Sequence, residues 1–107
     1  MKIDFKDKAL RILYEEGVSK DKNIRKLNQS VIRAFFKVIQ AFVNAKDLDE
    51  YIRNNKGAHY ERLQGKLKDL ESVRLNNQYR LLFQSSAAGN EIIITQIYVI
   101  EISKHYD

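Results

Sequence analysis

Two short runs with apolar residues at every second position lie at the end of ERLQGKLKDLESVRLNNQYRLLF, residues 61–83. Such a period of two is typical of β-strands that bury one face. Val73 and Leu75 occupy these positions in the first run, and Tyr79 and Leu81 occupy them in the second. The stretch therefore predicts two adjacent antiparallel strands.

The length of the turn between these strands determines which side chains face each other. A two-residue turn would place Leu75 opposite Arg80 and mix charged with apolar side chains on each face. A three-residue loop at residues 76–78 instead places Leu75 opposite Tyr79 on the core face. Asparagine tolerates the left-handed backbone that we expect in such a loop. The same register places Arg74 opposite Arg80 on the other face.

Two arginines that face each other across a strand pair repel, so this register favours an anion between or near them. Alternatively, both guanidinium groups extend into solvent or meet carboxylates such as Glu61 or Glu101, because exposed charge pairs contribute little. The pattern permits a phosphate-binding site and does not require one.

The residues that precede this hairpin predict mainly helices. Residues 2–5 alternate enough for a short edge strand, and residues 7–16 predict a helix that ends at Gly17. A second and longer helix starts from an N-cap at Asp21, and residues 47–53 predict a further helical turn. The long helix carries one apolar stripe, which we interpret as core packing. The stripe consists of Ile24, Leu27, Val31, Phe35, Val38, Ile39 and Phe42.

The end of the chain completes a small sheet. Residues 85–90, SSAAGN, predict a second turn, and residues 91–102, EIIITQIYVIEI, are apolar on both faces, as in a central strand. A strand, two to three helices and then an antiparallel meander indicate an α+β fold with the helices packed on one face of the sheet. We expect residues 1–107 to form a single domain, because the chain contains neither a linker nor a repeat.

The composition narrows the possible functions. Lys and Arg number 19 against 14 Asp and Glu, and the formal net charge of +5 favours a polyanionic partner. Basic side chains outnumber acidic ones in residues 56–82 but not in residues 83–107. The absence of cysteine excludes thiol nucleophiles, disulfides and thiolate metal sites. Because we find neither a membrane-spanning apolar run nor an export signal, we expect a cytoplasmic protein.

Three segments resemble one family of proteins. LQGKLKDLESVRLNNQYRLLF, residues 63–83, is similar to the signature segment of the RelE/ParE superfamily of type II toxin–antitoxin toxins. In that segment a Leu-Lys-Gly and a basic stretch precede Ser-x-Arg-hydrophobic, a turn, and aromatic-Arg-hydrophobic-hydrophobic-aromatic. IDFKDKALRILYEEG, residues 3–17, resembles the start of HigB-like toxins, and KHYD, residues 104–107, resembles the His-Tyr ending of YoeB-like members.

The resemblance implies a RelE-like fold and a ribosome-dependent mRNA endonuclease that a cognate antitoxin inhibits. Members of this group cleave without a metal or other cofactor, by attack of the RNA 2′-hydroxyl on the adjacent phosphate. This chemistry needs a general base, cations at the phosphorane and an acid for the departing 5′-oxygen. Two alternatives stay open: a ParE-like inhibitor that binds DNA gyrase, and a non-catalytic relative that only binds its antitoxin.

Position by position, the resemblance implies four catalytic residues. Glu61 becomes the general base, for which burial or neighbouring charges would have to raise its pKa; otherwise it is an ordinary exposed glutamate. Arg80 matches the arginine that stabilises the transition-state phosphate, which suits a planar guanidinium. His105 becomes the general acid, and Tyr106 orients or stacks on the scissile nucleotide. The alternative for these last two residues is a frayed C-terminus.

Three further residues are candidates for contacts to the RNA backbone: Lys66, Lys68 and Arg74, of which Arg74 matches a second arginine position of the family. Gln64 stands where the family has the lysine of Leu-Lys-Gly, and Lys66 and Lys68 lie close enough to substitute for that lysine. Whether Glu61 or a lysine accepts the 2′-proton stays open.

The alignment of the C-terminus is a second departure from the family. The interval between Arg80 and His105 is longer than in YoeB-like toxins, so Tyr106 or Lys104 could take the role of the acid. His59 is offset from the position of a histidine in HigB-like members, and we interpret it as a surface residue.

Overall fold

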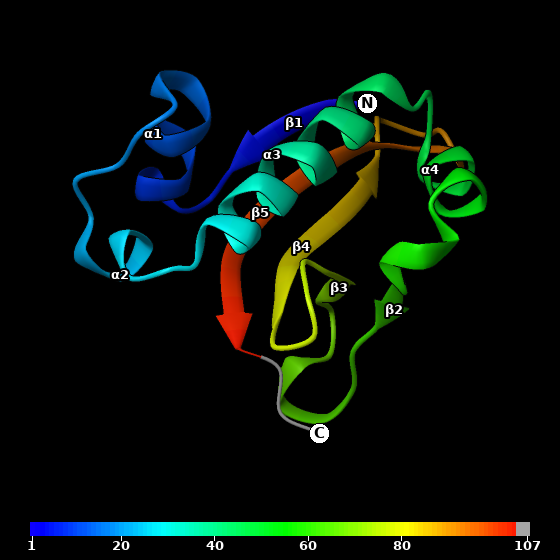
Figure 1. Cartoon of the computed structure of the whole chain (residues 1–107). Coiled ribbons are helices and arrows are strands. Elements are labelled where there is room, and N and C mark those ends of the chain that lie inside the picture. Colours follow the sequence, from blue (N-terminus) through cyan, green and yellow to red (C-terminus); the bar gives the residue numbers. More distant parts are fainter. Residues whose placement is uncertain (105–107) are drawn as a thin grey trace.

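A five-stranded sheet with the strand order β1-β5-β4-β3-β2 lies at the centre of the molecule (Figure 1). The computed structural model describes residues 1–104. The strands are β1 (Lys2–Phe5), β2 (Glu61–Arg62), β3 (Glu71–Arg74), β4 (Tyr79–Ala87) and β5 (Ile94–Lys104). β1 runs parallel to β5, and the other neighbouring strands are antiparallel. The predicted α+β class and the predicted edge strand are confirmed.

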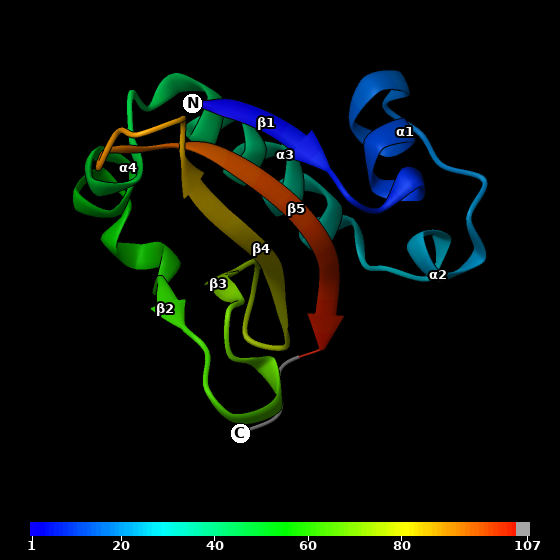
Figure 2. The ribbon, with the colours of Figure 1, turned by 180° about the vertical axis from the view of Figure 1, so that it is seen from behind.

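The helices lie on one face of this sheet. They are α1 (Lys8–Glu16), α2 (Lys22–Arg25), α3 (Gln29–Asn44) and α4 (Leu48–Asn54), with 3-10 turns at η1 (Lys56–Ala58) and η2 (Gly65–Leu67). Figures 1 and 2 show α3 lying along one face, while α1–α4 leave the opposite face uncovered. Within residues 1–104, every helix is too short or too polar to cross a bilayer.

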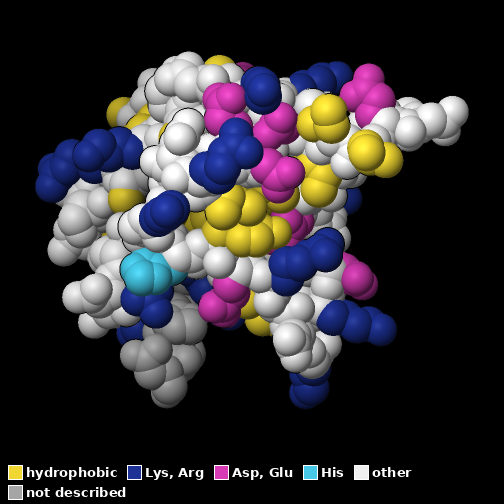
Figure 3. Space-filling view, turned by 90° about the vertical axis from the view of Figure 1, so that its right-hand side faces the viewer, with side chains coloured by type: hydrophobic (Ala, Val, Ile, Leu, Met, Phe, Trp, Pro, Cys, Tyr) yellow, Lys and Arg dark blue, Asp and Glu magenta, His cyan; other side chains and the backbone are white. Residues whose placement is uncertain are grey.

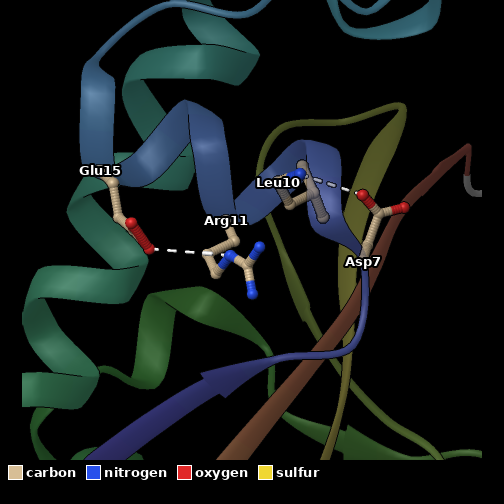
Figure 4. A network of polar contacts seen from close by, with 4 residues as sticks. All are labelled: Asp7, Leu10, Arg11 and Glu15. Atoms are coloured by element: carbon tan, nitrogen blue, oxygen red, sulfur yellow. Dashed lines mark hydrogen bonds and ion pairs between the residues drawn. The ribbon is translucent and has the colours of Figure 1, made fainter.

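Polar side chains set the ends of α1. The Asp7 carboxylate accepts a hydrogen bond from the Leu10 backbone N–H at 3.0 Å and caps the helix (Figure 4). Gly17 adopts a φ of 81°, a left-handed conformation that suits glycine, and ends it. Arg11 and Glu15 form an ion pair one turn apart, at 3.7 Å. The predicted first helix and its stop are confirmed.

The predicted long helix from Asp21 is wrong in one respect, because it is two helices. Asp21 caps the short α2, and the chain leaves the helical conformation before Asn28. Asn28 has an extended backbone, and its side chain accepts a hydrogen bond from the Ser30 N–H at 2.8 Å. A capping side chain offers the backbone an alternative to continuing the helix. The apolar residues keep their helical spacing across this break, so the sequence pattern does not predict it.

The core lies between α3 and the sheet. Four stripe residues of α3 are fully buried: Val31, Phe35, Ile39 and Phe42. They pack with the fully buried strand residues Val73, Leu81, Phe83, Ile97 and Val99. The Phe42 ring lies 5.1 Å from that of Phe83 and 4.5 Å from that of Tyr51. The interpretation of the stripe as core is confirmed for these residues.

The turn between β4 and β5 lies three residues further along the chain than predicted, at residues 88–93. Strand β4 continues to Ala87, so the first half of the predicted turn is strand, and β5 starts only at Ile94. Gly89 in the turn has a φ of 56°, which favours glycine. Ile92 and Ile93 are therefore in the turn and are 96% and 52% exposed, although their composition predicts a strand. The central position of β5 between β1 and β4 is confirmed.

Candidate functional site

The sheet register brings Arg74 and Arg80 directly opposite each other on β3 and β4, as predicted. The neighbouring pair, Val73 and Leu81, is fully buried against the helices. Successive side chains of a strand point to opposite faces, so the two arginines point to the face that α1–α4 leave uncovered (Figure 2). We call this surface the open face. By strand register it carries Glu61, Ser72, Arg74, Arg80, Leu82, Gln84 and Tyr98, of which Ser72 and Leu82 are buried.

The loop that fixes this register differs from the expectation in its conformation. Leu75 N–H donates to the Tyr79 carbonyl at 2.8 Å, as a three-residue loop requires. Among the described residues that are not glycine, only His59 and Asp69 have a positive φ, so the expected left-handed asparagine is wrong. The Asn76 side chain closes the loop instead, because its oxygen accepts from the backbone N–H groups of Gln78 and Tyr79, both at 2.8 Å. An asparagine that bonds to nearby backbone is a turn device in itself.

Neither arginine meets a carboxylate in the described part of the chain. Within residues 1–104, Arg11 and Glu15 form an ion pair on α1 (Figure 4), whereas neither Glu61 nor Glu101 pairs with Arg74 or Arg80. Arg74 is exposed, whereas Arg80 is half-buried. The Nε of Arg80 is buried, and within residues 1–104 it has no hydrogen-bond partner. A buried donor without an acceptor is unfavourable, so this nitrogen has an unmet requirement for an oxygen.

Glu61 lies on the open face but not in contact with Arg80. It pairs with Ser72 in the two-residue strand β2, one row along the sheet from the arginine pair. Standard strand spacing and rise place its Cα about 12 Å from that of Arg80. Glu61 is exposed.

The remaining basic candidates gather at one end of the sheet. Lys66 is in η2 and Lys68 follows it, and both are exposed on the β2–β3 connection. Figures 1 and 2 place this connection, the β3–β4 loop and the end of β5 at the same end of the molecule. Gln64 and His59 are also exposed, as expected for a surface histidine.

The end of β5 reaches the row of the arginine pair. Ser103 pairs with Arg80 and Lys104 pairs with Tyr79. The two predicted catalytic residues that follow, His105 and Tyr106, lie outside the described residues, so their roles stay predictions.

A buried carboxylate next to β2 is the main feature that the sequence reasoning missed. Glu71 is only 4% exposed and accepts hydrogen bonds from the Tyr60 hydroxyl at 2.6 Å, the Ser85 N–H at 2.8 Å and the Ser85 hydroxyl at 2.8 Å. Burial, followed by this bond to Glu71, raises the pKa of Tyr60. One signal was available, because Glu71 has the same strand parity as the core residue Val73. The network ties the residue before Glu61 to β3 and β4.

The surface on the α4 side carries no patch of a single charge. Figure 3 shows lysine and arginine side chains there interspersed with aspartate and glutamate, around an apolar area. The positive net charge is therefore not concentrated on this side of the molecule.

Solved structures of toxins share this fold. A YoeB/ParE toxin from Agrobacterium tumefaciens aligns over 99% of this chain and 100% of its own, with a TM-score of 0.50 and 19% identity. The toxin in a YoeB-YefM complex from Staphylococcus aureus aligns over 99% of this chain and 98% of its own, with a TM-score of 0.54 and 16% identity. The fold is therefore the RelE-like α+β fold of type II toxins.

Sequence comparison identifies the family within this class. Residues 3–102 match the model of HigB, described as the RelE-like toxin of a type II toxin–antitoxin system. The toxin HigB-1 of Vibrio cholerae is 37% identical over 84 residues, which cover 78% of this chain and 83% of that protein. The chain belongs to the HigB-like toxins. The suspected relationship to the RelE/ParE superfamily is confirmed.

Proposed function

We propose that this HigB-like toxin is an endoribonuclease that cleaves mRNA on the ribosome. The arginine pair on the open face carries this proposal, because within residues 1–104 neither guanidinium group meets a carboxylate. Non-bridging phosphate oxygens are suitable acceptors for a planar guanidinium. A single-stranded RNA backbone has such oxygens at regular intervals.

The proposed reaction needs no resident cofactor. The RNA 2′-oxygen attacks the adjacent phosphorus, the bond to the 5′-oxygen breaks, and the products are a 2′,3′-cyclic phosphate and a free 5′-hydroxyl. Arg80 stabilises the charge that develops on the phosphorane, and Arg74 holds a backbone phosphate. Glu61 or a lysine takes the 2′-proton, His105 protonates the departing 5′-oxygen, and Tyr106 orients or stacks on the scissile nucleotide.

Three exposed residues in or near β2, namely Glu61, Lys66 and Lys68, support the proposed reaction. The Cα atoms of Glu61 and Arg80 are about 12 Å apart by strand geometry, a separation that the two side chains and a phosphodiester between them can span. The exposure of Lys66 and Lys68 on the β2–β3 connection supports their proposed role in binding ribosomal RNA phosphates.

We also propose a protein antitoxin as the partner that inhibits this chain. The fold relative from Staphylococcus aureus is a toxin in a YoeB-YefM toxin–antitoxin complex. An antitoxin that covers the arginine pair would exclude RNA from it.

A translation assay tests the proposal. A defined message is translated on ribosomes with and without the protein, and new 5′ ends are mapped, with free message and a DNA gyrase assay in parallel. We expect cuts in the translated message alone, and loss of these cuts with Arg80→Ala but not with Arg33→Ala, an exposed arginine of α3. An intact message together with trapped, cleaved DNA would overturn the proposal in favour of gyrase inhibition.

A further inference from the structure

A tyrosine stands on the open face away from the arginine pair. Tyr98 of β5 lies directly opposite Gln84 of β4, and the flanking residues Ile97 and Val99 are fully buried in the core. Its half-buried ring therefore lies on the same face as Arg80. Gln84 is four residues from Arg80 along β4, about 13 Å at the usual strand rise.

A hollow of about 510 Å³ adjoins this tyrosine. Its lining includes Lys6, Arg62, Asp69, Gln84, Ser86 and Tyr98. The volume is within the range of small-molecule sites, about 300–1,000 Å³. The two cationic lining residues are matched by two carboxylates, because Glu71 also lines the hollow. The hollow is therefore close to neutral, unlike the arginine pair, and favours a neutral polar group over a phosphate.

Hydrogen bonds fix the side of the hollow that lies next to β3. Glu71 accepts hydrogen bonds from both the backbone N–H and the hydroxyl of Ser85, and the Gln84 amide reaches the Asp69 carbonyl at 3.5 Å. A side-chain amide has both donors and an acceptor, which is what the edge of a nucleobase requires. Sheet surfaces bind unpaired bases by stacking them on aromatic side chains, and hydrogen bonds to the base edges add to this.

A lysine covers the tyrosine in this structure. The Lys6 ammonium lies 5.5 Å from the centre of the Tyr98 ring. Lys6 is exposed, and an exposed lysine–ring contact is weaker than the stacking of a base on an aromatic ring. A base can therefore displace the ammonium, which then lies close to the phosphate of the incoming nucleotide.

We propose that Tyr98, Gln84 and Lys6 form a subsite for one unpaired RNA base, a few nucleotides from the phosphate held at Arg80. Tyr98 stacks on the base, Gln84 bonds to its edge and Lys6 binds the flanking phosphate. The inference rests on the proposed function, since it takes the same single-stranded RNA as the ligand. It predicts a base preference at one fixed distance from the cut.

Fluorescence quenching on ribosome-bound RNA tests the subsite. The message contains 2′-O-methyl groups that block the nucleophile, and 2-aminopurine replaces one base at a time. We expect quenching at one position with the wild-type protein and with Tyr98→Phe. Tyr98→Leu, which keeps an apolar side chain, should lose this quenching and bind about tenfold more weakly, as expected for the loss of one stacked base. Lys6→Ala should weaken binding, whereas Lys8→Ala, an exposed lysine of α1, should not.

The outcomes separate this inference from the proposed function. If unmodified message is cleaved but Tyr98→Leu binds and quenches like the wild type, the subsite is wrong and the nuclease stands. If no message is cleaved while Tyr98-dependent quenching persists, the subsite stands and the nuclease is wrong. If Tyr98→Leu weakens binding of the antitoxin and not of RNA, this part of the open face belongs to the protein partner and the inference is overturned.

Discussion

Replacing Glu71 with alanine should destabilise the fold strongly, although glutamate is usually a surface residue. The carboxylate is 4% exposed and accepts hydrogen bonds from the Tyr60 hydroxyl, the Ser85 N–H and the Ser85 hydroxyl. These bonds link three segments: the residue before β2, the first residue of β3 and the middle of β4.

The size of the effect follows from which donors can find water. Tyr60 and Ser85 are half-buried, so their hydroxyl groups can turn to solvent. The Ser85 N–H has a fixed direction, and leaving it without an acceptor costs about 1–3 kcal/mol. The two hydroxyl groups also lose a charged acceptor, which increases the loss of stability. Removing a buried carboxylate also removes the cost of its desolvation, which decreases the loss of stability. We expect a net loss of about 2–3 kcal/mol, a large part of the roughly 5–15 kcal/mol that such a domain has.

Urea unfolding followed by far-UV circular dichroism measures this loss, since the chain has no tryptophan. Tyr60→Phe should cost about 1 kcal/mol, and the double variant should cost less than the sum because the two residues share one bond. Glu91→Ala, at an exposed turn residue, is the control and should stay within about 0.5 kcal/mol of the wild type. A loss below about 0.5 kcal/mol for Glu71→Ala would refute the argument that this network holds the strands together.

Three further predictions concern pH, capping and salt. Burial raises the pKa of Tyr51 to about 12, so the folded state keeps a proton that the unfolded state releases above about pH 10. Stability should be complete below pH 10 and fall by about 1.4 kcal/mol per pH unit towards pH 12, and urea midpoints should show a smaller fall in Tyr51→Phe. Asp7→Ala should lower the unfolding free energy by about 1 kcal/mol through loss of the α1 cap, while Asp7→Ser should retain most of it; equal losses would contradict the capping role. Lys66→Ala and Lys68→Ala should each reduce the salt dependence of ribosome binding by about one counterion, unlike Lys37→Ala on α3, and an unchanged slope would remove them from the binding surface.

The pairing of the two arginines could be predicted because only one register of the strands buries all the core residues. Val73 and Leu81 must both be buried. Arg74 and Arg80 are their neighbours along the two strands, so both arginines must point to the opposite face of the sheet. The argument needs only the alternation and the loop length, so it succeeded although the expected loop conformation was wrong. The Asn76 side chain closes the loop by accepting hydrogen bonds from the backbone, and the loop still has three residues, as predicted.

Other features depend on contacts that a local pattern does not contain. The apolar stripe continues from Ile24 to Phe42, so the break before Asn28 depends on a capping bond that competes with the helix. Strand β2 has two residues, too few to show a period. Ile92 has the composition of a strand residue, yet the turn around Gly89 leaves it exposed. Local composition and periodicity do not determine where a capping bond ends a helix or where a turn shortens a strand.

The catalytic roles depend on distances within a bound complex, which the sequence pattern does not specify. The family resemblance assigned Glu61 and Arg80 to one reaction, and the register places both on the open face but about two strand spacings apart. The same register could not predict the burial of the Arg80 Nε, since that depends on packing around a half-buried side chain.

Single-turnover cleavage of a ribosome-bound message by Arg80→Ala tests the assignment of this arginine to the scissile phosphate most directly. With the protein in excess over ribosomes, and at concentrations where a further increase leaves the rate unchanged for each variant, the rate reports the chemical step and not the affinity. We expect the rate to fall by about a hundredfold or more, as for loss of one preorganised transition-state contact, while Arg33→Ala cleaves like the wild type. A fall of less than about threefold, with cuts at unchanged positions, would show that the phosphate is stabilised elsewhere.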